Sequence, residues 1–219
     1  MRNLFLSTFL TLALFCAPLI SCQPTAAPVA AHIALPAPLR TGGMSLNDAL
    51  AHRRSIRSFQ SAKLTLPELS QLLWAAQGVT DDKGHRTAPS AHAQYYLHLY
   101  LAQPDGFFEY LPAAHALRQL SDKDLRAALS SQATVQAAPV VFLIAGEYDR
   151  ASKGTDRETG LRLVNLEAGH AAQNLLLEAT ALNLGAVPVG GVDPKQAAQA
   201  ASLPAGITPI YLVPVGHPK

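Results

Sequence analysis

The longest regular pattern of apolar residues in the chain runs from Leu161 to Leu184 and ends at Gly185. At a rise of 1.5 Å per residue, this run predicts a helix of roughly 36 Å, long enough to cross a domain. Its apolar residues recur at the spacing of one helix face: Val164, Ala168, Ala171, Leu175, Ala179 and Leu182. Four polar residues gather on a second face: Glu167, His170, Gln173 and Asn174.

Capping patterns predict four shorter helices. A serine or threonine followed three residues later by an acidic residue opens the first three, and an Asp-Pro pair opens the fourth. These helices are predicted to begin after Ser45, Thr65, Ser121 and Asp193. The first three are expected to end near Arg53, at Gln77 before Gly78, and near Gln132.

Alternating or continuous apolar runs predict the strands. Residues 94–102 alternate leucines with tyrosines and a histidine, and an Asp-Gly turn leads into a return strand at 107–111. The continuous apolar run at 139–146 is typical of a central strand, and residues 209–215 form a last strand. Residues 187–190 are expected to form a short strand or turn. This order predicts an α+β fold with a mainly antiparallel or mixed sheet flanked by helices.

Composition places the chain among globular proteins. Its 219 residues are 49% hydrophobic and 15% charged, which fits one folded domain and excludes a disordered or fibrous protein. The formal net charge is only +2, so no nucleic acid or other polyanionic partner is indicated.

The N-terminus has the layout of a bacterial secretion signal. Arg2 precedes an apolar run at 4–14, which is too short to span a bilayer comfortably. The sequence Leu-Ile-Ser-Cys at 19–22 resembles a lipobox. We therefore expect residues 1–21 to be a lipoprotein signal peptide and Cys22 to carry the lipid, which would be the protein's sole membrane attachment in the bacterial cell envelope. The alternative is an ordinary cleaved signal with an incidental cysteine.

Only Cys16 and Cys22 are cysteines, so a lipidated Cys22 would leave the mature domain without a thiol. This excludes disulfides, thiolate metal sites and cysteine nucleophiles, and no metal site is predicted. Residues 22–43 are rich in alanine and proline and show no helical or strand period. They are predicted to be a semi-rigid tether, with the folded domain at 44–219.

The strongest candidate for ligand binding is an arginine cluster. Arg53, Arg54 and Arg57 surround the hydroxyl of Ser55 at the end of a predicted helix, and guanidinium groups suit phosphate oxygens. A solvated basic helix end is an equally good interpretation of the residues alone.

Two further segments offer main-chain groups for binding: the small-residue turn Pro89, Ser90 and Ala91, and the sequence Val189, Gly190 and Gly191. The chain has no GxGxxG, Walker, HExxH or GxSxG motif, so nucleotide triphosphate binding, zinc proteolysis and nucleophile-elbow hydrolysis lack support.

Six sequence motifs, in this order, resemble those of the nitroreductase-like FMN flavoproteins, with greatest similarity to the SagB/ThcOx branch of thiazoline and oxazoline oxidases. The similarity covers about Ser45 to Pro218. The motifs are RRSIR at 53–57, LPEL to WAAQG at 66–78, RTAPSA at 86–91, EAGHAAQN at 167–174, VGG at 189–191 and VPVG at 213–216.

This resemblance implies a role for each motif. Arg53, Arg54, Ser55 and Arg57 would hold the FMN phosphate and the pyrimidine side of the flavin. Residues 89–91 would lie against the ring and the ribityl chain, and residues 189–191 would lie near the reactive edge.

Members of the family are usually homodimers with FMN at the interface. The long helix is therefore expected at a dimer interface, with Gly169 at a close helix contact and His170 as scaffold. The implied activity is hydride transfer through flavin N5 on a small organic substrate, with an electron donor such as NAD(P)H. No residue is assigned as catalytic.

Two departures from the branch are visible. His92 and Ala93 follow Ala91 where the branch commonly has glycine and a Tyr-Pro pair, and Lys153-Gly154 lacks the aromatic residue that often follows this lysine. The residues of the azoline oxidases are therefore unsupported. Two other functions stay open: a flavin-binding module without turnover, and a cofactor-free envelope lipoprotein with a binding or structural role.

Overall fold

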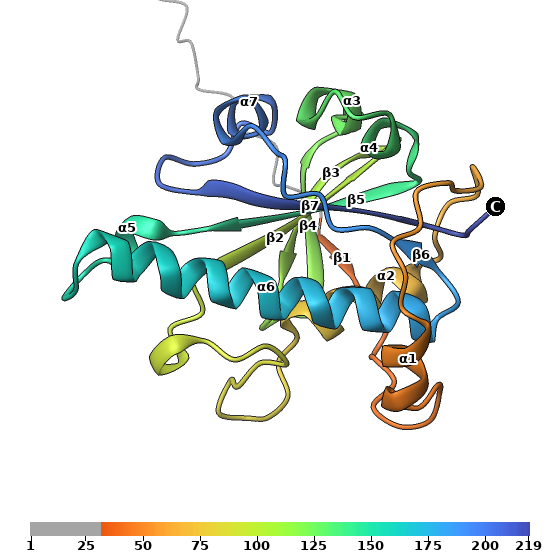
Figure 1. Cartoon of the computed structure of the whole chain (residues 1–219), viewed down its shortest axis with the longest axis horizontal. Coiled ribbons are helices and arrows are strands. Elements are labelled where there is room, and N and C mark those ends of the chain that lie inside the picture. The colour runs from red at the N-terminus through yellow and green to blue at the C-terminus, as the bar shows by residue number, and fades with distance from the viewer. Residues whose placement is uncertain (1–31) are drawn as a thin grey trace, which may run out of the picture.

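Figure 1 shows the computed structural model of the chain, which describes residues 32–219. The expected signal peptide and the lipidation site at Cys22 lie outside the described residues. Among residues 32–219, none of the helices combines the length and the apolar character that crossing a membrane requires.

A seven-stranded sheet forms the centre of the fold, in the order β1-β4-β3-β2-β5-β7-β6, and every pairing in it is antiparallel. The strands are β1 (His32–Ala34), β2 (Leu97–Gln103), β3 (Gly106–Leu111), β4 (Ala116–Ser121), β5 (Val140–Gly146), β6 (Gly185–Ala186) and β7 (Thr208–Gly216). The predicted α+β fold with a mainly antiparallel sheet is confirmed, and β5 lies inside the sheet between β2 and β7.

Helices cover both faces of the sheet (Figure 1). They are α1 (Leu46–His52), α2 (Leu66–Gln77), the 3-10 turn η1 (Ala91–Ala93), α3 (Arg126–Leu129), α4 (Ala133–Ala137), α5 (Tyr148–Ala151), α6 (Arg157–Ala181) and α7 (Pro194–Ala200). Helices α2 and α6 pack on one face, against the leucines of β2. Helices α3, α4 and α7 pack on the other face, against Tyr100 and Ala102.

The long helix α6 forms where the apolar pattern predicted it. Its apolar stripe is buried against the sheet, with Val164 and Leu175 fully enclosed. The helix begins before Leu161 because the side chain of Asp156 accepts a hydrogen bond from the Thr159 amide and caps the first turn. It ends at Ala181, and Asn183 takes a left-handed conformation with φ of 58°.

The capping pattern of α2 is also realised as predicted. Thr65 accepts a hydrogen bond from the Glu68 amide, and the Glu68 carboxylate accepts one from the Thr65 amide. The helix ends at Gly78, where an added Cβ would lie 2.1 Å from a Trp74 ring atom.

The helix predicted from Ser121 to Gln132 is wrong. Ser121 ends strand β4 and pairs with Phe107, and two short helices, α3 and α4, occupy the rest of the segment. The carboxylate of Asp124 binds the guanidinium of Arg126, and the residue before α3, Leu125, makes no side-chain cap. Pairing with β3 outweighed the local capping pattern, which is short and carries no long-range information.

The boundary between tether and domain also differs from the prediction for the residues that the structure describes. Residues 32–34 form β1, which pairs with β4, and Leu35 is buried in the core. The Gln71 amide group accepts from the Leu39 N–H at 2.9 Å and donates to the Leu39 carbonyl at 3.0 Å. An edge strand needs mainly main-chain hydrogen bonds, so a segment without a side-chain period can still join a sheet.

Candidate functional site

The arginine cluster lies at the end of α1 and continues beside the shortest strand, β6. Ser55 forms an isolated parallel bridge with Ala186, and the Ile56 amide donates to the Ala186 carbonyl at 3.0 Å. Gly185 allows this approach, because an added Cβ would lie 2.7 Å from Ile56 Cγ2. The cluster is therefore held by main-chain contacts with β6, just after the C-terminal end of α6.

Arg54 and Arg57 are exposed and Arg53 is half-buried, and none of the three makes an ion pair with any residue in the range 32–219. Arg54 donates to the Ala51 and Arg53 carbonyls, whereas the Arg57 contact with the Ser55 carbonyl is long, at 3.5 Å. Three cations without a carboxylate partner form a donor set that suits a phosphate group.

The C-terminus lies along the same segment. Phe59 forms an antiparallel bridge with Pro218, and the Lys219 amide donates to the Ser58 carbonyl at 3.2 Å. The chain therefore ends with a further cationic residue, Lys219, whose main chain lies beside Ser58 next to the arginine cluster.

Val189, Gly190 and Gly191 follow β6 closely along the chain. Val189 exchanges two main-chain hydrogen bonds with Leu212 of β7, and this fixes the segment against the sheet. Gly190 and Gly191 are exposed, and the nearest atoms to an added Cβ lie at 3.4 Å and 3.6 Å. The structure therefore brings two of the three predicted segments, 53–57 and 189–191, to the β6 end of the domain.

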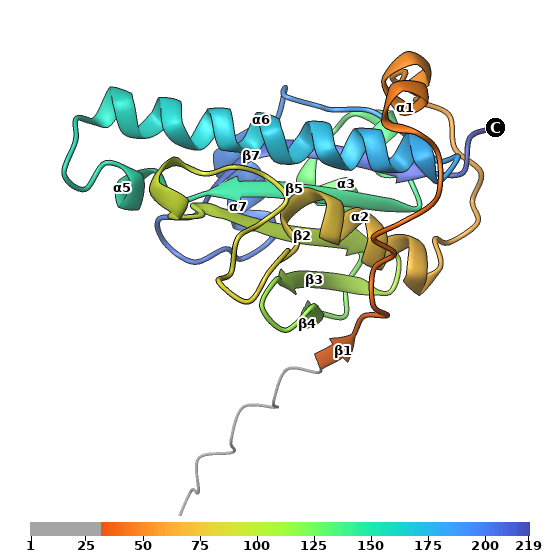
Figure 2. The ribbon, with the colours of Figure 1, turned by 90° about the horizontal axis from the view of Figure 1, so that it is seen from below.

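The third segment lies elsewhere on the chain. Ser90 donates its hydroxyl proton to Glu167 in the middle of α6, at 2.6 Å. Glu167 precedes the helix end at Ala181 by about 21 Å of helix axis. Figures 1 and 2 show the η1 turn and α1 beside opposite halves of α6. Within one chain, Pro89, Ser90 and Ala91 therefore do not join the other two segments.

The backbone of this loop is strained. His92, Ala93 and Tyr95 have φ values of 52°, 53° and 49°, in the left-handed region that favours glycine. His92 stands where the SagB/ThcOx branch commonly has glycine, and the chain takes a left-handed conformation there all the same. Residues in this region cost on the order of 1–3 kcal/mol each and persist only where surrounding contacts fix them.

Glu167 supplies the first of those contacts. Its side chain is buried, and one oxygen accepts from both the Ser90 hydroxyl and the Tyr96 amide. The other oxygen has no hydrogen-bond partner among residues 32–219. Burial raises the pKa of Glu167, and the bonds from Ser90 and Tyr96 only partly offset this. Glu167 is thus a structural hydrogen-bond acceptor that supports the loop.

Arg150 supplies the second contact, which sequence reasoning missed. Its guanidinium donates to the carbonyls of Gln94 and Tyr95 at 2.9 Å and 2.6 Å and to the Glu147 carboxylate at 2.7 Å. An acidic and a basic residue three positions apart after a buried strand were the only signal in the sequence. That spacing is too common to indicate that the arginine binds the main chain of a loop.

The polar residues predicted on one face of α6 do not share one environment in the structure. Asn174 donates to the Thr87 carbonyl at 3.3 Å and so extends the support of the loop. Gly169 and His170 are exposed, and no atom of residues 32–219 lies within 4 Å of a Cβ added at Gly169. Leu166 is 53% exposed beside them. The close helix contact predicted at Gly169 is not made within one chain.

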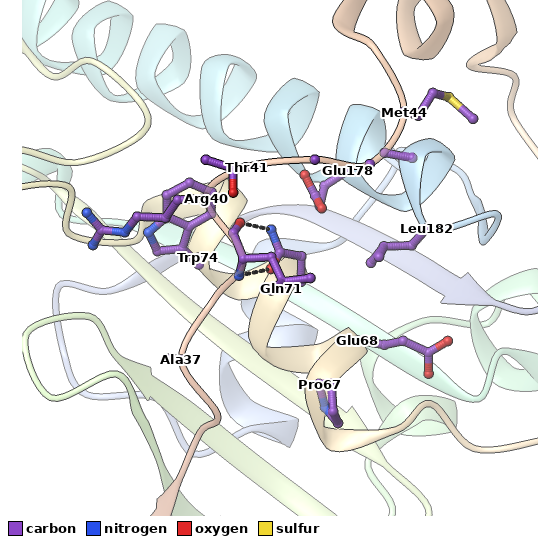
Figure 3. Close-up of a pocket in the computed structure, with 14 residues that line it drawn as sticks. Ala37, Arg40, Thr41, Met44, Pro67, Glu68, Gln71, Trp74, Glu178 and Leu182 are labelled. Carbon is purple, nitrogen blue, oxygen red and sulfur yellow. Dashed lines mark hydrogen bonds between the residues drawn. The ribbon is translucent and has the colours of Figure 1, made fainter.

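A cavity of about 350 Å³ lies between residues 37–44, α2 and α6 (Figure 3). Figure 3 shows the hydrogen bonds between Gln71 and the main chain of Leu39 at this cavity. The Glu178 side chain lines the cavity from α6. Burial raises the pKa of the Glu178 carboxyl. None of the ten predicted cofactor residues lines this cavity, so it is separate from the predicted flavin site. Among residues 32–219, no group of histidine and acidic residues has the arrangement of a metal site.

Comparisons with known proteins agree with this architecture. The model of the Nitroreductase family matches residues 50–217. A protein of Methanocaldococcus jannaschii that is named as a nitroreductase is 38% identical over 184 residues, covering 80% of this chain and 91% of that protein.

Two solved structures that are described as nitroreductases are also similar. One from Ralstonia eutropha has a TM-score of 0.82 and 33% identity, covering 90% of this chain and 93% of that chain. One from Anabaena variabilis has a TM-score of 0.76 and 26% identity, covering 88% of this chain but only 42% of that longer chain. Because the family model spans most of the sequence, the chain belongs to the nitroreductase family.

Proposed function

We propose that this protein is an FMN-dependent oxidoreductase that works as a homodimer on a small organic substrate. Membership of the nitroreductase family supports a flavin oxidoreductase. The observation that carries the finer proposal is the Ser55–Ala186 bridge, which joins the arginine cluster to the segment that leads four residues later to the exposed Gly190 and Gly191.

The residues fit the cofactor in charge and in space. Arg53, Arg54 and Arg57 would hold the phosphate, with the Ser55 hydroxyl as a further donor. Gly190 and Gly191 would let the flat ring approach the main chain, since neither carries a side chain. When bound, FMN supplies hydride transfer through N5, and the protein supplies position and electrostatics.

A second copy of the chain would complete the site. Pro89, Ser90 and Ala91 are rigidly supported, yet they lie along the other half of α6 from the arginine cluster. The exposed stripe of α6 with Leu166, Gly169 and His170 offers a small-residue contact for a partner helix. In a homodimer packed on this stripe, the loop of one chain would face the arginine cluster of its partner.

The flavin content of the purified protein tests this proposal. We expect bound FMN in the wild type and at least tenfold weaker FMN binding in Arg57→Ala, because one fixed charge on the phosphate is lost. Lys195→Ala removes an exposed cation from α7 and should leave FMN binding unchanged. Equal FMN affinity in all three proteins would contradict the assigned phosphate site.

Turnover is a separate measurement on the same protein. Bound FMN should be reduced by NADH or NADPH and reoxidised by a nitroaromatic or quinone acceptor. A flavin that is bound but not reduced by either nucleotide, while dithionite reduces it, would indicate a flavin-binding module without this activity. Protein that binds no FMN after refolding with the cofactor would support a cofactor-free role.

A further inference from the structure

A second cavity, of about 200 Å³, lies where strands β2 and β3 separate. The ladder between them runs from the Tyr100–Glu109 pair to the Gln103–Gly106 pair. The first residues of β2 and the last residues of β3 lie beyond this ladder, and the cavity opens there. Apolar walls come from Leu97, Leu99, Leu111 and Pro112.

Arg86 lines one end of this cavity without a counter-ion. Its side chain is half-buried and makes one hydrogen bond, from Nη1 to Gln77 Oε1 at 3.1 Å. The guanidinium lies 4.5 Å from the ring centroid of Tyr95. No carboxylate among residues 32–219 lies within ion-pair distance of it. Burial lowers the pKa of Arg86, and the charge of nearby Glu167 only partly offsets this.

Gln77 is a second donor at the same end. The residue is 1% exposed, and its Nε2 has no hydrogen-bond partner among residues 32–219. The orientation of the amide is fixed, because a guanidinium can only donate and the atom facing Arg86 must therefore be the oxygen. A buried N–H without an acceptor is unfavourable, so this end of the cavity lacks an acceptor for both Gln77 and Arg86.

Two glutamates, Glu109 and Glu147, also line the cavity, and both are already paired. Glu109 binds Arg118 and lies 3.4 Å from His98, and Glu147 lies 2.9 Å from His98 and 2.7 Å from Arg150. These carboxylates need no further cation. Their cations are already engaged, which leaves Arg86 as the cavity-lining cation that an incoming anion could bind.

We propose that this cavity binds a small organic carboxylate. The carboxylate accepts hydrogen bonds from the Arg86 guanidinium and from Gln77 Nε2, and a short apolar body packs against Leu97, Leu99 and Pro112. A planar guanidinium beside an amide N–H matches the two oxygens of a carboxylate, and the leucine walls favour an organic body over a bare inorganic ion.

This site is coupled to the loop that carries residues 89–91. The Tyr95 hydroxyl accepts from the Arg86 amide at 3.2 Å, and the Tyr95 amide donates to Ser90 Oγ at 2.8 Å. A ligand that holds Arg86 against the Tyr95 ring would therefore also stabilise the strained conformation of Tyr95. The binding itself does not depend on whether the protein carries flavin.

Calorimetric titration of the purified full-length protein with sodium propanoate tests the site, with neutral propanamide and sodium chloride as reference titrants. We expect saturable propanoate binding at millimolar concentration and at least tenfold weaker binding of propanamide. Arg86→Gln should weaken propanoate binding at least tenfold, and Gln77→Leu should weaken it severalfold. Lys195→Ala removes an exposed cation from α7, which does not line this cavity, and should leave propanoate binding within about twofold of wild type.

Three outcomes would overturn the proposal: propanamide binding as tightly as propanoate, chloride producing the same saturable heat, or Arg86→Gln binding propanoate normally. The first two would indicate ordered water or an unspecific anion in the cavity. The test is separate from the flavin proposal, because heat is measured on the protein whether or not it holds FMN. Far-ultraviolet circular dichroism checks that the variants fold. If Arg86→Gln does not fold, Gln77→Leu still tests the site.

Discussion

At the residue scale, the clearest feature is a carboxylate that is buried because it supports a loop. Glu167 satisfies the Ser90 hydroxyl and the Tyr96 amide with one oxygen, and its other oxygen is buried without a partner among the described residues. An acidic side chain in this position is costly when ionised. Its presence is explained by the left-handed residues of the loop, which need fixed hydrogen bonds.

Substitution of Glu167 tests this interpretation through pH. The pKa is raised in the folded protein above the value near 4.3 of an unfolded glutamate, so the native state binds more protons between the two pKa values. Stability relative to Glu167→Gln should therefore be highest below about pH 4 and should fall as pH rises through the folded pKa. Glu178 also has a raised pKa, but it is present in both proteins and cancels.

Chemical denaturation of the wild type and Glu167→Gln across pH 4 to 7 measures the difference. Glutamine keeps an oxygen for Ser90 and Tyr96, whereas Glu167→Ala loses both bonds and should cost about 2–3 kcal/mol at neutral pH. A difference between wild type and the glutamine variant that stays constant with pH would show that the pKa of Glu167 is not raised.

At the element scale, local sequence patterns succeeded where the chain could satisfy them within a few residues. The Thr65 and Ser45 caps both form, because a capping bond spans only three residues. The Ser121 pattern failed because β3 offered a full strand partner, and β4 pairs with both β3 and β1. Nothing within the segment itself distinguishes these outcomes.

Two matched substitutions check the distinction between a realised cap and an unrealised one. Thr65→Ala should lower the free energy of unfolding by about 1 kcal/mol, because the Glu68 amide loses its acceptor. Ser121→Ala removes only a bond from the Lys123 amide at an exposed turn and should cost under about 0.5 kcal/mol. Thermal or urea denaturation measures both, and equal losses would contradict the assigned role of Thr65.

At the scale of the whole molecule, two predicted binding segments follow or flank β6 after the C-terminal end of α6, and the third lies along the middle of that helix. The proposed homodimer would bring them together across the exposed stripe of α6, where Leu166 is 53% exposed.

Leu166→Glu should convert the proposed homodimer to a monomer at micromolar concentration and reduce FMN binding, since the charge would be buried in the contact. Leu120→Glu is the matched control: Leu120 is 43% exposed on β4, away from α6, and this variant should remain dimeric. Sedimentation equilibrium distinguishes the two. A Leu166→Glu protein that stays dimeric would place the interface on another surface.

Periodicity and capping patterns in the sequence were enough to predict several elements. The sequence predicted α2 with its boundaries, the buried stripe of α6, the β2–β3 hairpin, the inner strand β5 and the polar motifs of the family. These follow from contacts a few residues apart or from one repeating face. The arginine cluster and the glycines at 190 and 191 were also visible as residues with suitable chemistry.

Which distant segments lie side by side could be read only from the folded chain. Three contacts join residues far apart in sequence: the pairing of residues 32–34 with β4, the bridge from Ser55 to Ala186, and the hydrogen bond from Arg150 to the Tyr95 carbonyl. The unpaired donors of Arg86 and Gln77 are likewise visible only once burial is known. Long-range contacts depend on how the sheet closes over its core, and a local pattern of polar and apolar residues does not carry that information.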